Sequence, residues 1–238
     1  MKLALDLILL LIVLSCVWIG YKRGLIMGIG GMIVVIVSLY AATLLSTAFS
    51  YEAVPALRPF ADGYVEKHMK TTVLKKLDLA DTQLSYEDVL TNDPTLRHAF
   101  CYESYKILGI HSSAAEQMAK EAEKYADDNK TDITSSVVEI LCKRIAYIAG
   151  ITLFFCIILI GLTALGNLTN LSFRLPNMER LDYWGGAFMG LVLGVTYCVL
   201  ICWLLRFLGL LIGPDTLQNS ILGRFFIAIN FLTKGIGI

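Results

Sequence analysis

The sequence is poor in charged residues and carries no motif of a familiar enzyme class. Charged residues make up only 17% of the 238 residues, against about 25% in soluble domains. The chain has no H-E-x-x-H zinc motif, no G-x-S-x-G nucleophile elbow, and no glycine-rich phosphate-binding or dinucleotide-binding motif. We therefore expect no catalytic residue, no cofactor and no metal site, and we expect that the chain is not an enzyme.

Histidine is scarce as well, and basic residues form no patch with interleaved aromatics. The three histidines are His68, His98 and His111, and their spacing matches no common metal-ligand pattern. They are interpreted as ordinary surface or core residues. Without a basic patch, a nucleic-acid partner is not expected.

What the sequence has instead is long apolar stretches. Hydrophobic residues make up 56% of the chain, against about 45–50% in soluble domains. Four windows are nearly free of charge: Leu3 to Tyr21, Gly24 to Tyr51, Ile145 to Phe173, and Tyr183 to Leu205. Since about 20 apolar residues span a bilayer as a helix, the fold class is predicted to be all-α: a polytopic membrane protein with about four transmembrane helices. The lipid bilayer is therefore an expected partner.

The first window is predicted to stay in the mature protein as a helix of a transmembrane hairpin, residues 1–48. A cleaved signal peptide would need a small-residue cleavage site, and no A-x-A pattern is present. Val13-Leu14-Ser15-Cys16 resembles a lipoprotein cleavage box, but apolar residues continue beyond it. Lys22 and Arg23 at the hairpin tip are expected to face the cytoplasm, which places the N-terminus outside.

Residues 49–142 are predicted to form a helical, water-facing insert. Residues 50–142 hold 16 of the 20 acidic residues and 10 of the 20 basic ones, so this stretch is net negative. Ser113-Ala114-Ala115-Glu116 fits a capping box, while Asn92-Asp93-Pro94 and Asp127-Asp128-Asn129 indicate breaks between helices. If the insert is external, Cys101 and Cys142 pair as a disulfide or remain two free thiols.

Residues 143–208 are predicted to hold transmembrane helices 3 and 4 with a connecting loop. The third helix is expected to begin near Thr134 and to carry Lys143 and Arg144 through the interface. In the fourth, Gly186, Gly190 and Gly194 recur every four residues, a pattern typical of close helix packing in membranes. Basic residues flank both membrane faces, so their count does not settle the orientation.

Residues 209–238 are predicted to be an amphipathic C-terminal tail. Pro214-Asp215-Thr216 resembles a helix start, and an apolar stripe follows it. A helix on the membrane surface, or docked on the bundle, is the favoured interpretation over a fifth span, because Arg224 and Asn230 interrupt the stripe.

Three elements together resemble the colicin V production protein (CvpA) family. They are an early acidic residue, Asp6, with the hairpin Arg23-Gly24; the loop Leu175 to Asp182 running into the Gly186-x-x-x-Gly190 helix; and the tail Gln218-Asn219-Ser220-Ile221-Leu222. The positions that match the family pattern are Asp6, Arg23, Gly24, Arg180, Leu181, Asp182 and Ser220. The long acidic insert is a departure from the family pattern. From the residues alone, Asp6 lies near the interface and is favoured to be structural.

The resemblance implies an integral protein of the bacterial inner membrane linked to toxin production or export and to envelope homeostasis. Some relatives carry a protease domain outside the membrane after the fourth helix, which implies that both termini and the insert are extracytoplasmic here. The leading hypothesis is a scaffold or accessory protein that self-associates or binds an envelope or secretion protein. The alternative is a small oligomeric channel or transporter assembled around the glycine-bearing helices.

Overall fold

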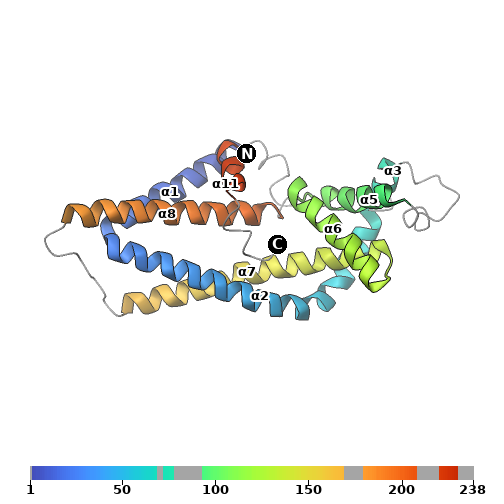
Figure 1. The fold of residues 1–238 in the computed structure, drawn as a ribbon, viewed down its shortest axis with the longest axis horizontal. Helices are drawn as coiled ribbons and strands as arrows, with labels where there is room; N and C mark the ends of the chain where they lie inside the picture. Colours follow the sequence, from blue (N-terminus) through green and yellow to red (C-terminus); the bar gives the residue numbers. More distant parts are fainter. Residues whose placement is uncertain (1, 69–71, 78–92, 169–178, 208–219, 230–238) are drawn as a thin grey trace. The chain divides into compact units, whose positions relative to one another are not determined.

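The computed structural model describes residues 2–68, 72–77, 93–168, 179–207 and 220–229, and every regular element in these ranges is a helix. Four helices are long and apolar enough to cross a membrane: α1 (Lys2–Arg23), α2 (Leu25–His68), α7 (Ile133–Leu168) and α8 (Glu179–Leu205). Shorter helices are α3 (Leu74–Lys76), α5 (Pro94–Ile107), α6 (Ser112–Asn129) and α11 (Ile221–Ala228). Figure 1 traces them along the chain. The predicted all-α membrane fold is confirmed.

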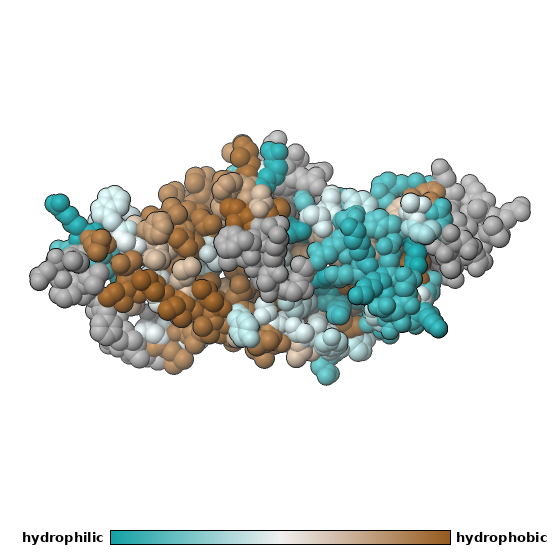
Figure 2. Space-filling view, viewed as in Figure 1, coloured by the Kyte–Doolittle hydropathy of each residue, from teal (hydrophilic) through white to brown (hydrophobic). Residues whose placement is uncertain are grey.

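The surfaces of the four long helices are apolar, and the protein itself covers little of them. In the most apolar window of α1 only 11% of the residues are buried, and in that of α8 only 33%. Large side chains such as Trp18, Ile33, Ile160 and Phe188 are more than half exposed. Figure 2 shows the same contrast, with brown side chains over the membrane helices and teal over α5 and α6. Because water would oppose so much exposed apolar area, lipid is the solvent of these helices, and the chain is a multi-pass membrane protein.

The chain divides into two compact units. The membrane unit comprises residues 1–46, 150–205 and 215–238, and the insert unit comprises residues 47–149 and 206–214. In the membrane unit α1 packs along α8, and α11 contacts both. A small core lies where these three helices meet, formed by Leu9, Cys198, Val199, Cys202 and Phe226.

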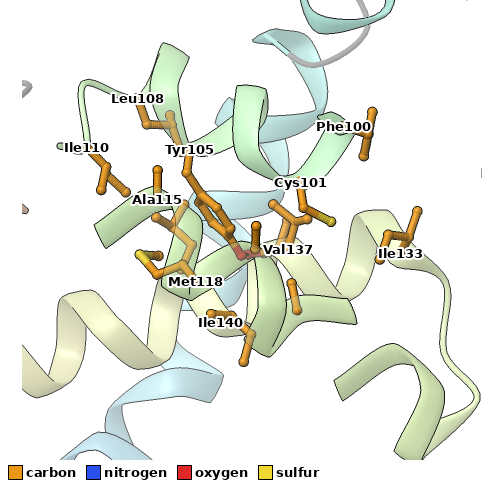
Figure 3. Packing of buried hydrophobic residues seen from close by; sticks show 14 of the residues in the cluster. Phe100, Cys101, Tyr105, Leu108, Ile110, Ala115, Met118, Ile133, Val137 and Ile140 are labelled. Atoms are coloured by element: carbon orange, nitrogen blue, oxygen red, sulfur yellow. The ribbon is translucent and has the colours of Figure 1, made fainter. Parts of the chain in front are cut away.

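The insert unit has a protein-like core of its own, shown in Figure 3. Tyr105 of α5 is fully buried, and its hydroxyl donates a hydrogen bond to the carbonyl oxygen of Val137 at 3.0 Å. Met118 and Ala115 of α6 pack around it. Burial raises the pKa of Tyr105 well above 10.0, so the phenol stays neutral. This core explains why a stretch with many charges still folds.

The helix starts of the insert differ in part from the predicted ones. Asp93 caps α5 by accepting from the backbone N–H of Thr95 at 2.9 Å, and Pro94 occupies the first turn, as the predicted break there requires. The predicted capping box at Ser113 is wrong. The N-cap of α6 is His111, whose Nδ1 accepts from the N–H of Ser113 at 3.3 Å.

The second helix is longer than the hydrophobic window suggested. α2 runs on through Pro55 and Pro59 to His68, so the boundary predicted between residues 48 and 49 falls inside a helix. Each proline removes one backbone hydrogen bond. In compensation, Val54 is buried in the insert core, and Arg58 forms an ion pair with Glu139.

Helix α7 begins at Ile133, as the predicted start near Thr134 anticipated, and α6 ends at Asn129, with Lys130 in the left-handed conformation as its C-cap. The predicted break at Asp127-Asp128-Asn129 is therefore the last turn of α6. The described C-terminal helix begins at Ile221. The predicted start at Pro214-Asp215-Thr216, and the loop residues 175–178, lie outside the described residues.

Candidate functional site

The tight turn between α1 and α2 is held by a carboxylate from α8. Gly24 joins the two helices with φ +85°, a left-handed conformation that favours glycine. The backbone N–H of Leu25 donates to Asp182 Oδ1 at 2.8 Å, and only 4% of Asp182 is exposed. A Cβ at Gly24 would lie 2.8 Å from the Asp182 carboxyl carbon, so there is no room for a side chain. Asp182 therefore caps α2 and complements the positive end of its dipole.

Along α8 beyond Asp182, a row of glycines packs against α1. A Cβ at Gly186 would lie 2.8 Å from Gly24 Cα, one at Gly190 would lie 3.1 Å from Val17 Cα, and one at Gly194 would lie 3.0 Å from Val13 Cα. These are backbone atoms, which no side-chain rotation can move away. The predicted packing face of α8 is thus occupied by α1 of the same chain, and we call it the glycine seam.

Sequence reasoning missed the partner half of the glycine seam. Gly20 of α1 is buried, and a Cβ there would lie 2.8 Å from Gly190 Cα. A signal was present, because Cys16, Gly20, Gly24 and Gly28 recur every four residues across the first two helices. That ladder of small residues matches the one on α8.

A second carboxylate, that of Asp6, holds the C-terminal helix. Asp6 Oδ1 accepts from the Ser220 hydroxyl at 2.6 Å and from the N–H of Leu222 at 3.0 Å. The Ser220 oxygen in turn accepts from the N–H of Gly223 at 2.8 Å. Ser220 is fully buried, and it is the N-cap of α11. An acidic residue early in α1 and a serine in the tail therefore form one helix-capping site.

The seven family-motif positions thus fall into three groups. Gly24 and Asp182 meet at one end of the α1–α8 pair, and Asp6 and Ser220 meet where α11 contacts these helices. Arg23, Arg180 and Leu181 are exposed. Close to these three residues in the sequence, Tyr21 stacks on Tyr183 with ring centroids 5.1 Å apart. Aromatic and basic residues together are typical of a membrane–water interface.

The insert contains one cluster of titratable groups across the α5–α6 contact. His98 Nδ1 lies 3.2 Å from Glu123 Oε1, and its Nε2 lies 3.2 Å from Glu116 Oε2. Burial disfavours the charged imidazole, but the two carboxylates outweigh it and raise the pKa of His98. Glu116 also pairs with Lys120 at 3.1 Å. A neutral imidazole has a single N–H, so only the imidazolium can donate to both carboxylates.

The remaining candidate groups show no metal-like arrangement within the described ranges. There, no three His, Cys, Asp or Glu side chains lie close enough to hold a metal ion. Cys101 and Cys142 are buried free thiols, which decides between the two predicted states. Burial raises the pKa of Cys101 to about 12, so this thiol is unreactive at neutral pH. The side chain of His68 lies outside the described residues.

The chain matches no curated protein and no solved structure. The family model described as colicin V production protein matches residues 112–230, half of the chain. The match includes α6, α7, α8 and α11, and with them Asp182, Ser220 and the glycines of α8. The chain therefore belongs to the colicin V production protein family.

Proposed function

We propose that this protein is a scaffold or accessory factor of the cell membrane that serves toxin production or export, or envelope homeostasis. The observation that carries the proposal is that the two units differ in character: one is a membrane anchor and the other a folded polar domain. In the membrane unit, the carboxylates of Asp6 and Asp182 each hold the N-terminus of another helix. The insert unit has its own buried core around Tyr105 and an acidic composition. A fixed membrane anchor that carries a folded water-facing domain suits the recruitment of a partner.

The partner surface in this proposal is the polar side of the insert helices. Lys120, Lys124, Asp127 and Asp128 of α6 are exposed, whereas the alanines of the same helix are buried. Helix α6 as a whole carries five acidic residues and two lysines, and residues 50–142 are net negative, so the proposed partner is an envelope or secretion protein with a complementary basic face.

The proposed orientation places the insert and both termini outside the cytoplasm. The hydrogen bond between Leu25 and Asp182 brings the start of α8 to the hairpin tip, so Arg180 joins Lys22 and Arg23 at the same end of the α1–α8 pair. Because the connection between α1 and α2 is so short, its basic residues Lys22 and Arg23 are costly to translocate, and this supports a cytoplasmic position for that end.

The glycine seam bears on the channel alternative. A channel assembled around the glycine faces of several protomers would need these faces to be free. In the structure α1 covers Gly186, Gly190 and Gly194, which supports the scaffold over that mode of assembly.

A photo-crosslinking experiment in growing cells tests the proposal. A photoreactive residue replaces Asp128 on the insert, and in a matched control it replaces Ile157, which is 57% exposed on α7. We expect the Asp128 probe to give a defined adduct with an envelope or secretion protein, and we expect the Ile157 probe to give mainly lipid adducts. Equal adduct patterns at both positions, together with solute flux through liposomes containing the purified protein, would favour the channel.

Single-cysteine labelling in a background without native cysteines tests the orientation. A membrane-impermeant reagent added to intact spheroplasts should label Lys120→Cys but not Arg23→Cys. The reverse pattern would place the insert in the cytoplasm and refute the proposed topology.

A further inference from the structure

The insert unit contains an apolar pocket that its fold does not fill. The pocket has a volume of about 240 Å³, and α2, α6 and α7 contribute to its wall. Its lining includes Leu57, Ala61, Met118, Leu141 and Ile148. The pocket opens to the surface of the unit, and its walls are almost entirely apolar. A ligand with an apolar part of matching shape would cover these walls.

The position of the pocket along α7 indicates where such a ligand comes from. The candidate span of α7, Ile133–Gly166, is 34 residues long, or roughly 50 Å at 1.5 Å per residue, so this helix extends beyond the ~30 Å hydrocarbon core. Lys143 lies with its ammonium 5.5 Å from the ring centroid of Tyr51 on α2. Such a pair of a basic and an aromatic residue is typical of the headgroup region. Leu141 and Ile145, which precede and follow Lys143 on α7, both line the pocket. The pocket is therefore expected in the headgroup region of the membrane.

The residues that line the pocket indicate the chemical class of the ligand. Among the described residues of the lining, Arg144 is the one that carries a charge; its side chain is 11% exposed and forms an ion pair with Glu121. A guanidinium has five N–H donors, so it can donate to the carboxylate of Glu121 and also to a second anion. The other lining residues within the described ranges are apolar. A long apolar chain ending in an anionic group matches this distribution.

The volume fits part of one lipid tail. A cavity of about 150 Å³ holds benzene, and in proportion a pocket of about 240 Å³ holds nine or ten carbon atoms. We propose that the pocket binds one acyl chain of a membrane phospholipid, with the lipid phosphate beside Arg144. This inference is independent of the proposed scaffold role.

The test uses the full chain in vesicles of phosphatidylcholine and phosphatidylglycerol that contain a phospholipid with a diazirine near the end of one acyl chain. After irradiation, labelled residues are mapped by mass spectrometry. Leu108, Ile110 and Met118 line the pocket but lie outside the candidate membrane spans. We expect labels at these residues, because only a chain that enters the pocket reaches them.

A filling variant and a matched control make the result decisive. Ala61→Phe places a ring into the pocket, whereas Ala56→Phe makes the same change at an exposed site of α2 outside it. Labelling of Met118 should be lost in Ala61→Phe and unchanged in Ala56→Phe. Circular dichroism checks that both variants are folded, and Ile148→Phe serves as a second filling variant if Ala61→Phe is not.

Three outcomes would overturn the proposal. Labels confined to lipid-facing residues such as Ile157 and Ile160 would show that no acyl chain enters the pocket. Unchanged labelling of Met118 in both filling variants would show that the chain reaches this residue by another route. Labelling of the pocket by a free diazirine fatty acid but not by the phospholipid would assign the site to a fatty acid.

Discussion

The glycine seam predicts that adding one methyl group at a glycine destabilises the protein inside the α1–α8 contact and does not destabilise it outside this contact. In Gly190→Ala the new Cβ would lie 3.0 Å from the Cys16 carbonyl carbon and 3.1 Å from Val17 Cα. Carbon atoms pack best at about 3.5–4.0 Å, so the two helices must separate by roughly 0.5–1 Å along a tightly packed contact. Overpacking of this kind costs about 1–3 kcal/mol.

The matched control is Gly161→Ala on α7. No atom lies within 4 Å of a Cβ at Gly161. Both variants gain helix propensity, which is about 1 kcal/mol for replacing glycine by alanine, so the control isolates this gain. We therefore expect Gly161→Ala to be as stable as the parent or more stable, and Gly190→Ala to be less stable than the control by about 1–3 kcal/mol.

The assay is reversible unfolding of the purified protein by increasing SDS in mixed micelles, followed by far-UV circular dichroism. A crosslink between α1 and α8 at the seam provides a second readout, because its yield should fall only in Gly190→Ala. The reasoning is refuted if both alanine variants shift the unfolding midpoint equally, or if Gly190→Ala raises it.

Two further predictions concern the polar contacts. Ser220→Ala removes the N-cap of α11 and one partner of Asp6, and loss of such a cap costs about 0.5–2 kcal/mol; hydrogen exchange at the Leu222 and Gly223 amides should accelerate, and protection equal to the parent's would contradict the capping role. His98 has a pKa raised above its ordinary 6.5 by two carboxylates, so its contribution to stability is fully present below pH 6.5 and is lost as pH rises through the raised value. Thermal unfolding between pH 5 and pH 9 should show this loss in the parent but not in His98→Gln, and identical pH profiles would show that the cluster does not couple to folding.

The membrane helices could be identified from the sequence because a helix that spans lipid needs about 20 consecutive apolar residues. The four hydrophobic windows correspond to α1, α2, α7 and α8. The end of α2 was not predicted, because hydropathy falls near Tyr51 while the helix continues through two prolines. Packing against the insert core decides that continuation, and packing is invisible in a local window.

The pairing of the motif residues could not be derived from one sequence. Asp6 and Ser220 are 214 positions apart, and Leu25 and Asp182 are 157 apart. In lipid, hydrophobicity does not determine which apolar helices become neighbours. The spacing of the glycines predicted a close contact on α8, but it did not identify α1 as the helix on the other side.

The hydrogen bond between Leu25 and Asp182 has a consequence for how the protein is made. The first hairpin leaves the ribosome early, yet the carboxylate that completes its turn belongs to a segment synthesised 157 residues later. Until α8 is inserted, the opening amide of α2 has to rely on water or lipid headgroups at the membrane surface. The earliest part of the chain to enter the bilayer is therefore among the last to reach its final structure.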